Sequence, residues 1–211
     1  MEGEFDMNRR RALMGMNEGD SMQKWTTDGI LSGLEPSGEL YTELSLWRFS
    51  LAYNTKITKI VAPNYNNTYS ASESASLFAA MTSLEYAIMP KNNRIGNAMF
   101  NGDSKLKGLD FLGAWGIGST AFTNCAALKT IVIRGGSVAS LNNTNALNGT
   151  PFASGKAGGK IYVPQSITSN YQANSNWATI LSNNSNNQIL AIEGSTYETH
   201  YVDGSDIPSG G

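Results

Sequence analysis

The chain has 211 residues, of which 15% are charged, and its net charge at pH 7 is −2. This weak charge gives no strong field for nucleic acid or an anionic membrane, so neither is expected as a partner. The single cysteine, Cys125, excludes a disulfide framework. The length fits one domain with tails better than two domains.

Residues 1–20 are predicted to form an N-terminal arm with a basic cluster, Arg9, Arg10 and Arg11. The apolar run behind them, residues 12–14, is too short for a secretory signal peptide. No stretch of the chain approaches the length of apolar sequence that a membrane span needs. We therefore expect no signal peptide and no transmembrane segment, and the arm is either a docking peptide, through its three arginines, or a disordered tail.

Residues 21–50 lack the repeat that fills the middle of the chain. Their apolar residues mix spacings of two and four, which fits either a strand or a helix. The exposed end of a repeat stack is apolar and must be covered. We therefore predict an N-terminal cap here, with an edge strand lying against the first repeat.

Three stretches that begin at Phe78, Phe100 and Phe122 superpose at a period of 22 residues without a gap. Each ends in a short strand, and a leucine recurs between the phenylalanine and the strand. Related copies begin near residues 51 and 152, so about five irregular copies span residues 51–164. This period lies within the range of leucine-rich repeats, and the insertions between copies map to loops.

A unit of this size cannot bury its apolar face alone and needs neighbours on both sides. We expect the repeated side chains to stack in interior columns, where each buried one contributes roughly 1.5–3 kcal/mol. The predicted core residues are Phe78, Phe100, Phe122, Phe152, Leu84, Leu106, Leu128 and Trp177. The predicted fold is a β-rich repeat of the α/β type, a leucine-rich-repeat solenoid with an N-terminal cap and a C-terminal capping helix.

The motif I-G-x-x-A/M-F-x-x-x-x-x-L followed by a short strand, clearest from Ile117 to Ile133, resembles the BspA-type leucine-rich repeat. The segment from Ile161 to Ile180 resembles the usual exit from such arrays. The likeness covers about residues 50–193 and is specific for the fold. It implies no single function, because the family includes bacterial surface adhesins, protist surface proteins and many phage or prophage proteins.

Residues 165–193 are predicted to form the C-terminal cap. A helix starts at Gln165 and Ser166, turns Tyr171 and Trp177 towards the last coil, and is followed by a short strand over residues 188–192. The remaining tail, residues 194–211, is acidic, with no Lys or Arg after Lys160. A tail that is free in solution and one that orders against another subunit look alike in the sequence.

Catalytic motifs are weak in comparison with the repeat. The run GIGSTA, residues 116–121, has the form of a dinucleotide loop, but the repeat explains its glycines better. Cys125 is expected to be a small buried residue, and His200 is expected to be solvated. We therefore predict a protein that is not an enzyme, with no catalytic residues, cofactor or metal.

Repeat proteins bind through exposed side chains of the sheet and through inserted loops. The candidate contact residues flank the buried strand positions or lie in loops. They are Lys59, Tyr65, Tyr69, Tyr86, Lys107, Lys129 and Arg134. The Asn-rich insertion from Leu141 to Thr150 is either a binding surface or a plain linker.

Our leading hypothesis is a structural protein of a phage or prophage particle: a head decoration protein, a fibre or a tail-tip module. Residues 7–17 resemble the opening of many structural proteins from phages of gut bacteria, and the arm would dock on other virion proteins. The repeats would then bind host-surface protein or glycan, and a homo-oligomer is compatible with the sequence. The alternatives are a bacterial or protist cell-surface adhesin that binds host matrix protein, and a cytoplasmic protein-interaction scaffold.

Overall fold

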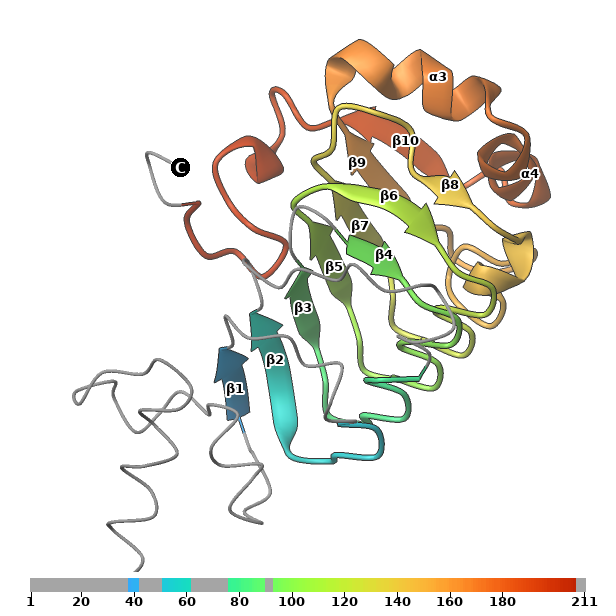
Figure 1. Cartoon of the computed structure of the whole chain (residues 1–211). Coiled ribbons are helices and arrows are strands. Elements are labelled where there is room, and N and C mark those ends of the chain that lie inside the picture. The colour runs from blue at the N-terminus through green and yellow to red at the C-terminus, as the bar shows by residue number, and fades with distance from the viewer. Residues whose placement is uncertain (1–37, 42–50, 62–75, 90–92, 208–211) are drawn as a thin grey trace, which may run out of the picture.

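The fold is seen in a computed structural model that describes residues 38–41, 51–61, 76–89 and 93–207 (Figure 1). Two parallel sheets face each other across one apolar core, and helices lie at one end of the stack. Parallel strands need a crossover segment between them, and here successive coils of the chain provide it.

The larger sheet, called sheet A, contains seven parallel strands in the order β1-β2-β3-β5-β7-β9-β10. Most coils add one strand to it, so neighbours in the sheet follow one another along the chain. The strands are β1 (Gly38–Tyr41), β2 (Ile57–Val61), β3 (Tyr86–Met89), β5 (Gly108–Phe111), β7 (Thr130–Ile133), β9 (Lys160–Val163) and β10 (Gln188–Ala191). β1 pairs with β2 at the edge of the sheet.

The smaller sheet, sheet B, contains β4 (Asn93–Ile95), β6 (Ala114–Ile117) and β8 (Ser140–Leu141), all parallel. The sequence predicted one strand per copy, so this second sheet is an addition. Gly118 follows β6, and a Cβ atom there would lie 2.7 Å from the backbone nitrogen of Asn97. Only glycine therefore fits where these two coils approach each other.

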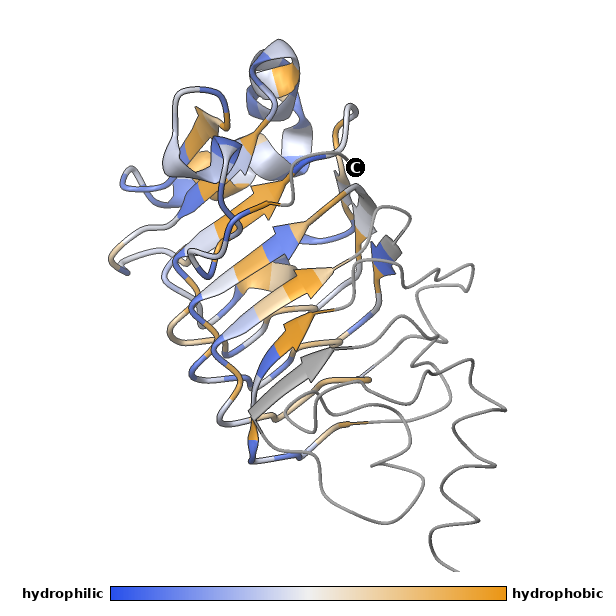
Figure 2. Ribbon diagram, turned by 90° about the vertical axis from the view of Figure 1, so that its left-hand side faces the viewer, coloured by the Kyte–Doolittle hydropathy of each residue, from blue (hydrophilic) through white to orange (hydrophobic). Residues whose placement is uncertain are grey.

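The phenylalanines of the repeat stack inside the molecule. The ring centroids of Phe78 and Phe100 lie 5.4 Å apart, and those of Phe100 and Phe122 lie 5.8 Å apart. These distances are typical of favourable aromatic pairs. The leucines of the repeat, Leu84, Leu106 and Leu128, are each 0% exposed in the same core. The core contains hydrophobic residues of every strand of sheet A from β2 to β10, and Figure 2 shows the hydrophobic stretches of these strands in orange.

The backbone also repeats. Ser76, Ala98 and Thr120 have positive φ angles of 58°, 54° and 56°, and they follow one another at the period of the repeat. A second left-handed position occurs four residues later in each copy, at Ala80, Gly102 and Asn124. Left-handed residues are uncommon outside glycine, so their recurrence shows that these three coils share the same two bends.

The last coil has a different register from the one expected. The amide of Phe100 donates to the Ala121 carbonyl, and that of Phe122 donates in the same way to the Ala146 carbonyl. Leu147, rather than Phe152, therefore occupies the position that follows Phe122 in the stack. The insertion between these copies is split, so part of it precedes Leu147 and part follows. Phe152 is still 0% exposed within the core.

The Asn-rich insertion continues the coil instead of forming a free loop. It contains β8 and the 3-10 helix η2 (Thr144–Leu147), whose Ala146 and Leu147 are buried. The side chain of Asn143 accepts from the Asn145 amide and caps this helix. Much of this polar stretch is thus used to hold its own backbone.

Residues beyond β9 contribute side chains to the core near η2. They form the 3-10 helix η3 (Gln165–Ile167), α3 (Thr168–Ala173) and α4 (Ser175–Asn183). The indole Nε1 of Trp177 donates to the Ala139 carbonyl at 2.8 Å, and the Ala139 amide donates to the Tyr171 hydroxyl at 2.8 Å. The two aromatic side chains thus satisfy the backbone just before β8.

Inside the coils, Asp103 occupies the position that Met81 and Cys125 occupy in the neighbouring copies. Its Oδ1 accepts from the Met81 amide at 2.7 Å, whereas its Oδ2 has no hydrogen-bond partner among the described residues. Burial raises the pKa of Asp103 from 3.8 to about 9, so the carboxyl is protonated at neutral pH.

Candidate functional site

The candidate site lies on the outer face of sheet A, which points away from the core. Along β5 and β7, Leu109, Phe111, Ile131 and Ile133 face the core, and the residues between them face outward. In β3, β5, β7 and β9 the two outward positions hold Tyr86 and Ile88, Gly108 and Asp110, Thr130 and Val132, and Lys160 and Tyr162. These side chains, unlike the inner ones, do not repeat.

The C-terminal segment runs back over this outer face. Residues 192–207, here called the strap, leave β10, form the 3-10 helix η4 (Thr196–Glu198) and cross the sheet towards β2 (Figure 1). The strap ends in a tight reversal, where the amide of Tyr201 donates to the Ser205 carbonyl and that of Ile207 donates to the Thr199 carbonyl. The described part of the tail is therefore ordered on its own chain.

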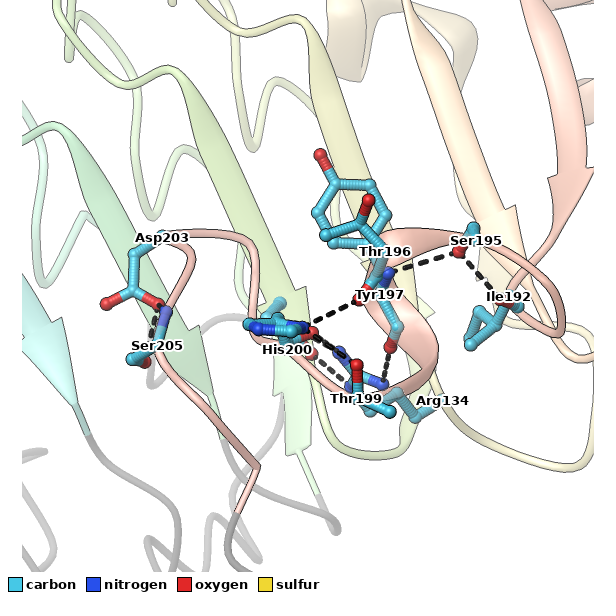
Figure 3. A network of polar contacts seen from close by, with 10 residues as sticks. Arg134, Ile192, Ser195, Thr196, Tyr197, Thr199, His200, Asp203 and Ser205 are labelled. Carbon is cyan, nitrogen blue, oxygen red and sulfur yellow. Dashed lines mark hydrogen bonds and ion pairs between the residues drawn. The ribbon is translucent and has the colours of Figure 1, made fainter.

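An ion pair between Asp110 and Arg134 anchors the strap. The guanidinium Nε and Nη2 atoms donate to the two carboxylate oxygens at 2.8 and 2.7 Å, a bidentate geometry that makes charged hydrogen bonds strong. Nη1 donates to the Tyr197 carbonyl at 2.7 Å, and Nη2 also donates to the His200 carbonyl at 3.0 Å (Figure 3). One arginine thus joins a strand, its own loop and the strap.

The side chain of Asp110 is 0% exposed, and the side chain of Arg134 is 15% exposed. Burial raises the pKa of Asp110, and the hydrogen bonds and charge of Arg134 act in the opposite direction. The register neighbours of Asp110 are Ile88 and Val132, so the carboxylate stands in an apolar row. A charge in this row is tolerated because the arginine pairs with it.

Apolar contacts hold the strap at two further points. Val202 packs over Gly108, where an added Cβ would lie 2.3 Å from the Val202 Cγ2 atom. Tyr197 meets Tyr162 edge-on, with ring centroids 4.7 Å apart. Val202 belongs to a small cluster with Val132 and Ile192, separate from the main core. The missing side chain at residue 108 thus provides the space that Val202 fills.

At the far end of the strap, Lys59 of β2 forms an ion pair with Asp203. The hydrogen bonds and charge of Lys59, together with Ser205, hold the pKa of Asp203 below its usual value, although burial opposes this. The strap is therefore attached to sheet A from β9 to β2.

A hollow of about 560 Å³ remains open between the strap and the starts of β5 and β7. Its volume falls in the range of small-ligand pockets. Its lining combines two tyrosines and two lysines with smaller residues: Tyr86, Lys107, Ala126, Ala127, Lys129, Thr130, Tyr197 and Val202. Lys107 pairs with Glu85 at 2.7 Å and lies over the Tyr86 ring, 5.8 Å from its centroid.

The predicted contact residues have separate positions on this face. Tyr86, Lys107 and Lys129 come together around the hollow. Lys59 and Arg134 hold the strap, so their charged groups are used within the chain. Tyr65, Tyr69 and the three arginines Arg9, Arg10 and Arg11 lie outside the described residues.

Sequence reasoning missed Gly108, Asp110, Tyr197 and Val202. One signal was present: Leu109-Asp110-Phe111 places an acid where the neighbouring copies have Ile88 and Val132. A charge in an apolar strand row needs a partner, but the sequence did not identify which basic residue supplies it. No local sequence pattern predicts the contact between Gly108 and Val202.

Other reactive groups lie away from the hollow. Cys125 is buried, its Sγ donates to the Phe100 carbonyl at 2.9 Å, and burial raises its pKa. His200 forms a contact of 3.1 Å with Asp206 on the strap. Across the described ranges, no group of three or more His, Cys, Asp or Glu side chains could hold a metal ion. The same ranges contain no helix with the length and apolarity of a bilayer span.

Comparison with known families gives one match. The family model for the BspA type leucine rich repeat region matches residues 45–150 and 74–198, with six copies of the repeat. The matched stretches include every described strand from β2 to β10. No curated protein and no solved structure matches the chain.

Proposed function

This chain belongs to the BspA-type leucine-rich-repeat family, and we propose that it is a non-catalytic, adhesin-like protein that binds another protein through the outer side of sheet A. The observation that carries the proposal is the contrast between the two sides of the sheet. The inner positions repeat because packing requires it, whereas Tyr86, Lys107 and Lys129 gather around an open hollow that the core does not need.

A binding experiment with the full chain tests this proposal. The labelled chain is titrated onto intact bacterial cells and onto immobilised collagen, laminin and fibronectin. We expect saturable binding to at least one surface, and we expect unlabelled chain to compete for it. A chain unfolded by heat serves as the control. If the native chain shows only linear adsorption to every surface, an adhesin-like role is wrong.

We also propose that the fold is a solenoid with both ends closed. Residues 51–164 would be the leucine-rich-repeat solenoid, closed by residues 21–50 at one end and residues 165–193 at the other, with residues 194–211 as a tail. The pairing of β1 with β2 and the packing of Tyr171 and Trp177 against residue 139 support closed ends. Closure is needed because both ends of a repeat stack are apolar.

More specifically, we propose that the protein is a component of a virion. Its support is the sequence of residues 7–17, whose Arg9, Arg10 and Arg11 would dock on another virion protein. Mass spectrometry of density-purified particles, compared with the washed cell envelope, tests the location. Deletion of residues 1–17 should abolish incorporation into particles and leave the repeats folded. Recovery from the envelope alone would favour a cell-surface adhesin, and recovery from neither would favour a cytoplasmic scaffold.

A further inference from the structure

The hollow beside the strap has the composition of a binding site for an acidic peptide. Tyr86 and Tyr197 both line it, Thr130 contributes a hydroxyl, and Ala126, Ala127 and Val202 contribute apolar surface. Tyrosines offer large contact areas with a polar end and lose little conformational entropy on binding. Two lysines complete the lining, so the chemistry favours a ligand with both apolar and anionic groups.

Lysines outnumber carboxylates in the coils that build this edge of the sheet. Asp110 is the only carboxylate side chain between residues 104 and 192, and Arg134 already pairs with it. The same stretch carries five lysines: Lys105, Lys107, Lys129, Lys156 and Lys160. Among them Lys107 has Glu85 as its partner, and exposed Lys129 has no ion pair among the described residues.

The two lysines of the hollow come from adjacent coils. The Lys129 amide donates to the Lys107 carbonyl at 3.1 Å, so the residues are neighbours across the start of the sheet. A carboxylate that reaches Lys129 would also approach Lys107, whose ion pair with Glu85 is largely exposed and can exchange partners. Two lysines that meet one carboxylate give recognition by charge without the planar fork of an arginine.

The strap supports a peptide as the ligand. It is itself an acidic peptide on this face, with four carboxylates and no Lys or Arg between residues 193 and 207. It binds by placing Asp203 on Lys59, Val202 on Gly108 and Tyr197 on Tyr162. The hollow next to it offers the same elements, a lysine, an apolar contact and an aromatic ring, without an occupant from the described chain.

We propose that this hollow binds an acidic, tyrosine-containing peptide segment of a partner protein, with its carboxylates at Lys107 and Lys129 and its aromatic side chain against Tyr86 and Tyr197. The proposal rests on the adhesin-like function above and specifies its ligand class. The strap forms one wall of the site, so the partner binds beside it without displacing it.

The test uses the full chain and the acetylated, amidated peptide EYEEYE with a fluorescent label, followed by anisotropy in low salt. We expect saturable binding that Lys129→Gln weakens about tenfold, that Lys107→Gln weakens by a similar or smaller factor, and that salt weakens for all variants. The peptide QYQQYQ should bind about tenfold more weakly, because it keeps the tyrosines and lacks the carboxylates.

Matched controls are Lys105→Gln and Lys156→Gln, which remove one exposed lysine each outside the hollow. Binding that falls equally in all four variants would mean non-specific attraction and would overturn the site. Preference for a heparin-derived hexasaccharide over EYEEYE would overturn the peptide class. If the Lys107→Gln and Lys129→Gln chains still bind cells or matrix proteins normally, the hollow is refuted and the adhesin-like function stands.

Discussion

The two faces of sheet A differ in how far equivalent positions hold the same kind of residue. On the inner face, equivalent positions hold similar residues in successive strands, as with Ala87, Leu109, Ile131 and Ile161. On the outer face the neighbouring register positions hold Tyr86, Gly108, Thr130 and Lys160, which differ in size, polarity and charge.

This difference teaches what repetition can and cannot specify. A repeat stack is stabilised by contacts between equivalent positions of neighbouring coils, so the inner side chains must be alike. The outer face meets only one partner within the described chain, the strap, and each contact there is made once. The inner face thus holds the stack of coils together, and the outer face determines which segment lies on it.

The largest expected effect comes from breaking the inner column. Phe122→Ala removes a fully buried ring that stacks on Phe100 and contacts Phe111, and we expect a loss of about 3–5 kcal/mol in the free energy of unfolding. Urea unfolding followed by circular dichroism measures this loss. Tyr53→Ala, at a side chain that is 79% exposed, is the control and should change little. Equal effects of the two substitutions would contradict the stacked core.

The next effect comes from the outer anchor. Arg134→Gln leaves the buried Asp110 carboxylate without its cation, and we expect a loss of about 2–3 kcal/mol, below the range for a fully buried pair because the arginine is partly exposed. The strap should also open, which chymotrypsin would detect by faster cleavage at Tyr197 and Tyr201.

A double-mutant cycle with Asp110→Asn separates the pair from the other contacts of Arg134. Coupling well above about 0.5 kcal/mol is expected for side chains in direct contact. Additive losses would mean that the ion pair does not anchor the strap.

A smaller effect should follow from filling the space below Val202. Gly108→Ala introduces a Cβ atom 2.3 Å from the Val202 Cγ2 atom, so the strap must shift, at a cost of about 1–2 kcal/mol. Hydrogen exchange at the Val202 amide should become faster, while the inner strands stay protected. Gly136→Ala is the matched control, since no atom lies within 4 Å of the added Cβ. Combination with Val202→Ala should restore protection; continued fast exchange would refute this contact.

Asp103 and Asp110 are both buried, but among the described residues only Asp110 pairs with a cation. The pKa of Asp103 is about 9 in the folded chain and 3.8 for an aspartate in water, so the native state holds one more proton between these values. Stability should therefore fall as pH rises from about 5 to 8, by up to about 1.4 kcal/mol per pH unit.

Asp103→Asn keeps the acceptor for the Met81 amide and removes the titration. Its free energy of unfolding should depend less on pH than that of the natural chain over the same interval. Parallel pH profiles for the two chains would show that Asp103 is ionised in the folded protein, contrary to this expectation.

Much of the inner structure followed from the sequence. The period of 22 residues predicted the strands that became β3, β5 and β7, and it identified the phenylalanines that stack at 5.4 and 5.8 Å. It failed at the last coil, because Phe152 matched the pattern by residue type and Leu147 matches it by hydrogen bonding. Sheet B was not predicted, since its strands are short and partly polar.

The candidate site was only partly predictable. Exposed residues beside buried strand positions pointed to Tyr86, Lys107 and Lys129, which do line the hollow. The same reasoning selected Lys59 and Arg134, whose charges are engaged with Asp203 and Asp110 inside the chain. Solvent exposure was inferred from the alternation of residues along each strand. This alternation cannot predict that a segment distant in the sequence covers the outer face.

By itself the sequence determined the repeat, because the burial of an apolar face is a local requirement that each copy repeats at fixed spacing. Only the tertiary structure decided what covers the outer face. The contacts of Val202 with Gly108, of Arg134 with the Tyr197 carbonyl and of Asp203 with Lys59 join residues far apart in the chain. Each occurs once and leaves no period in the sequence, so it becomes visible only when the chain is folded.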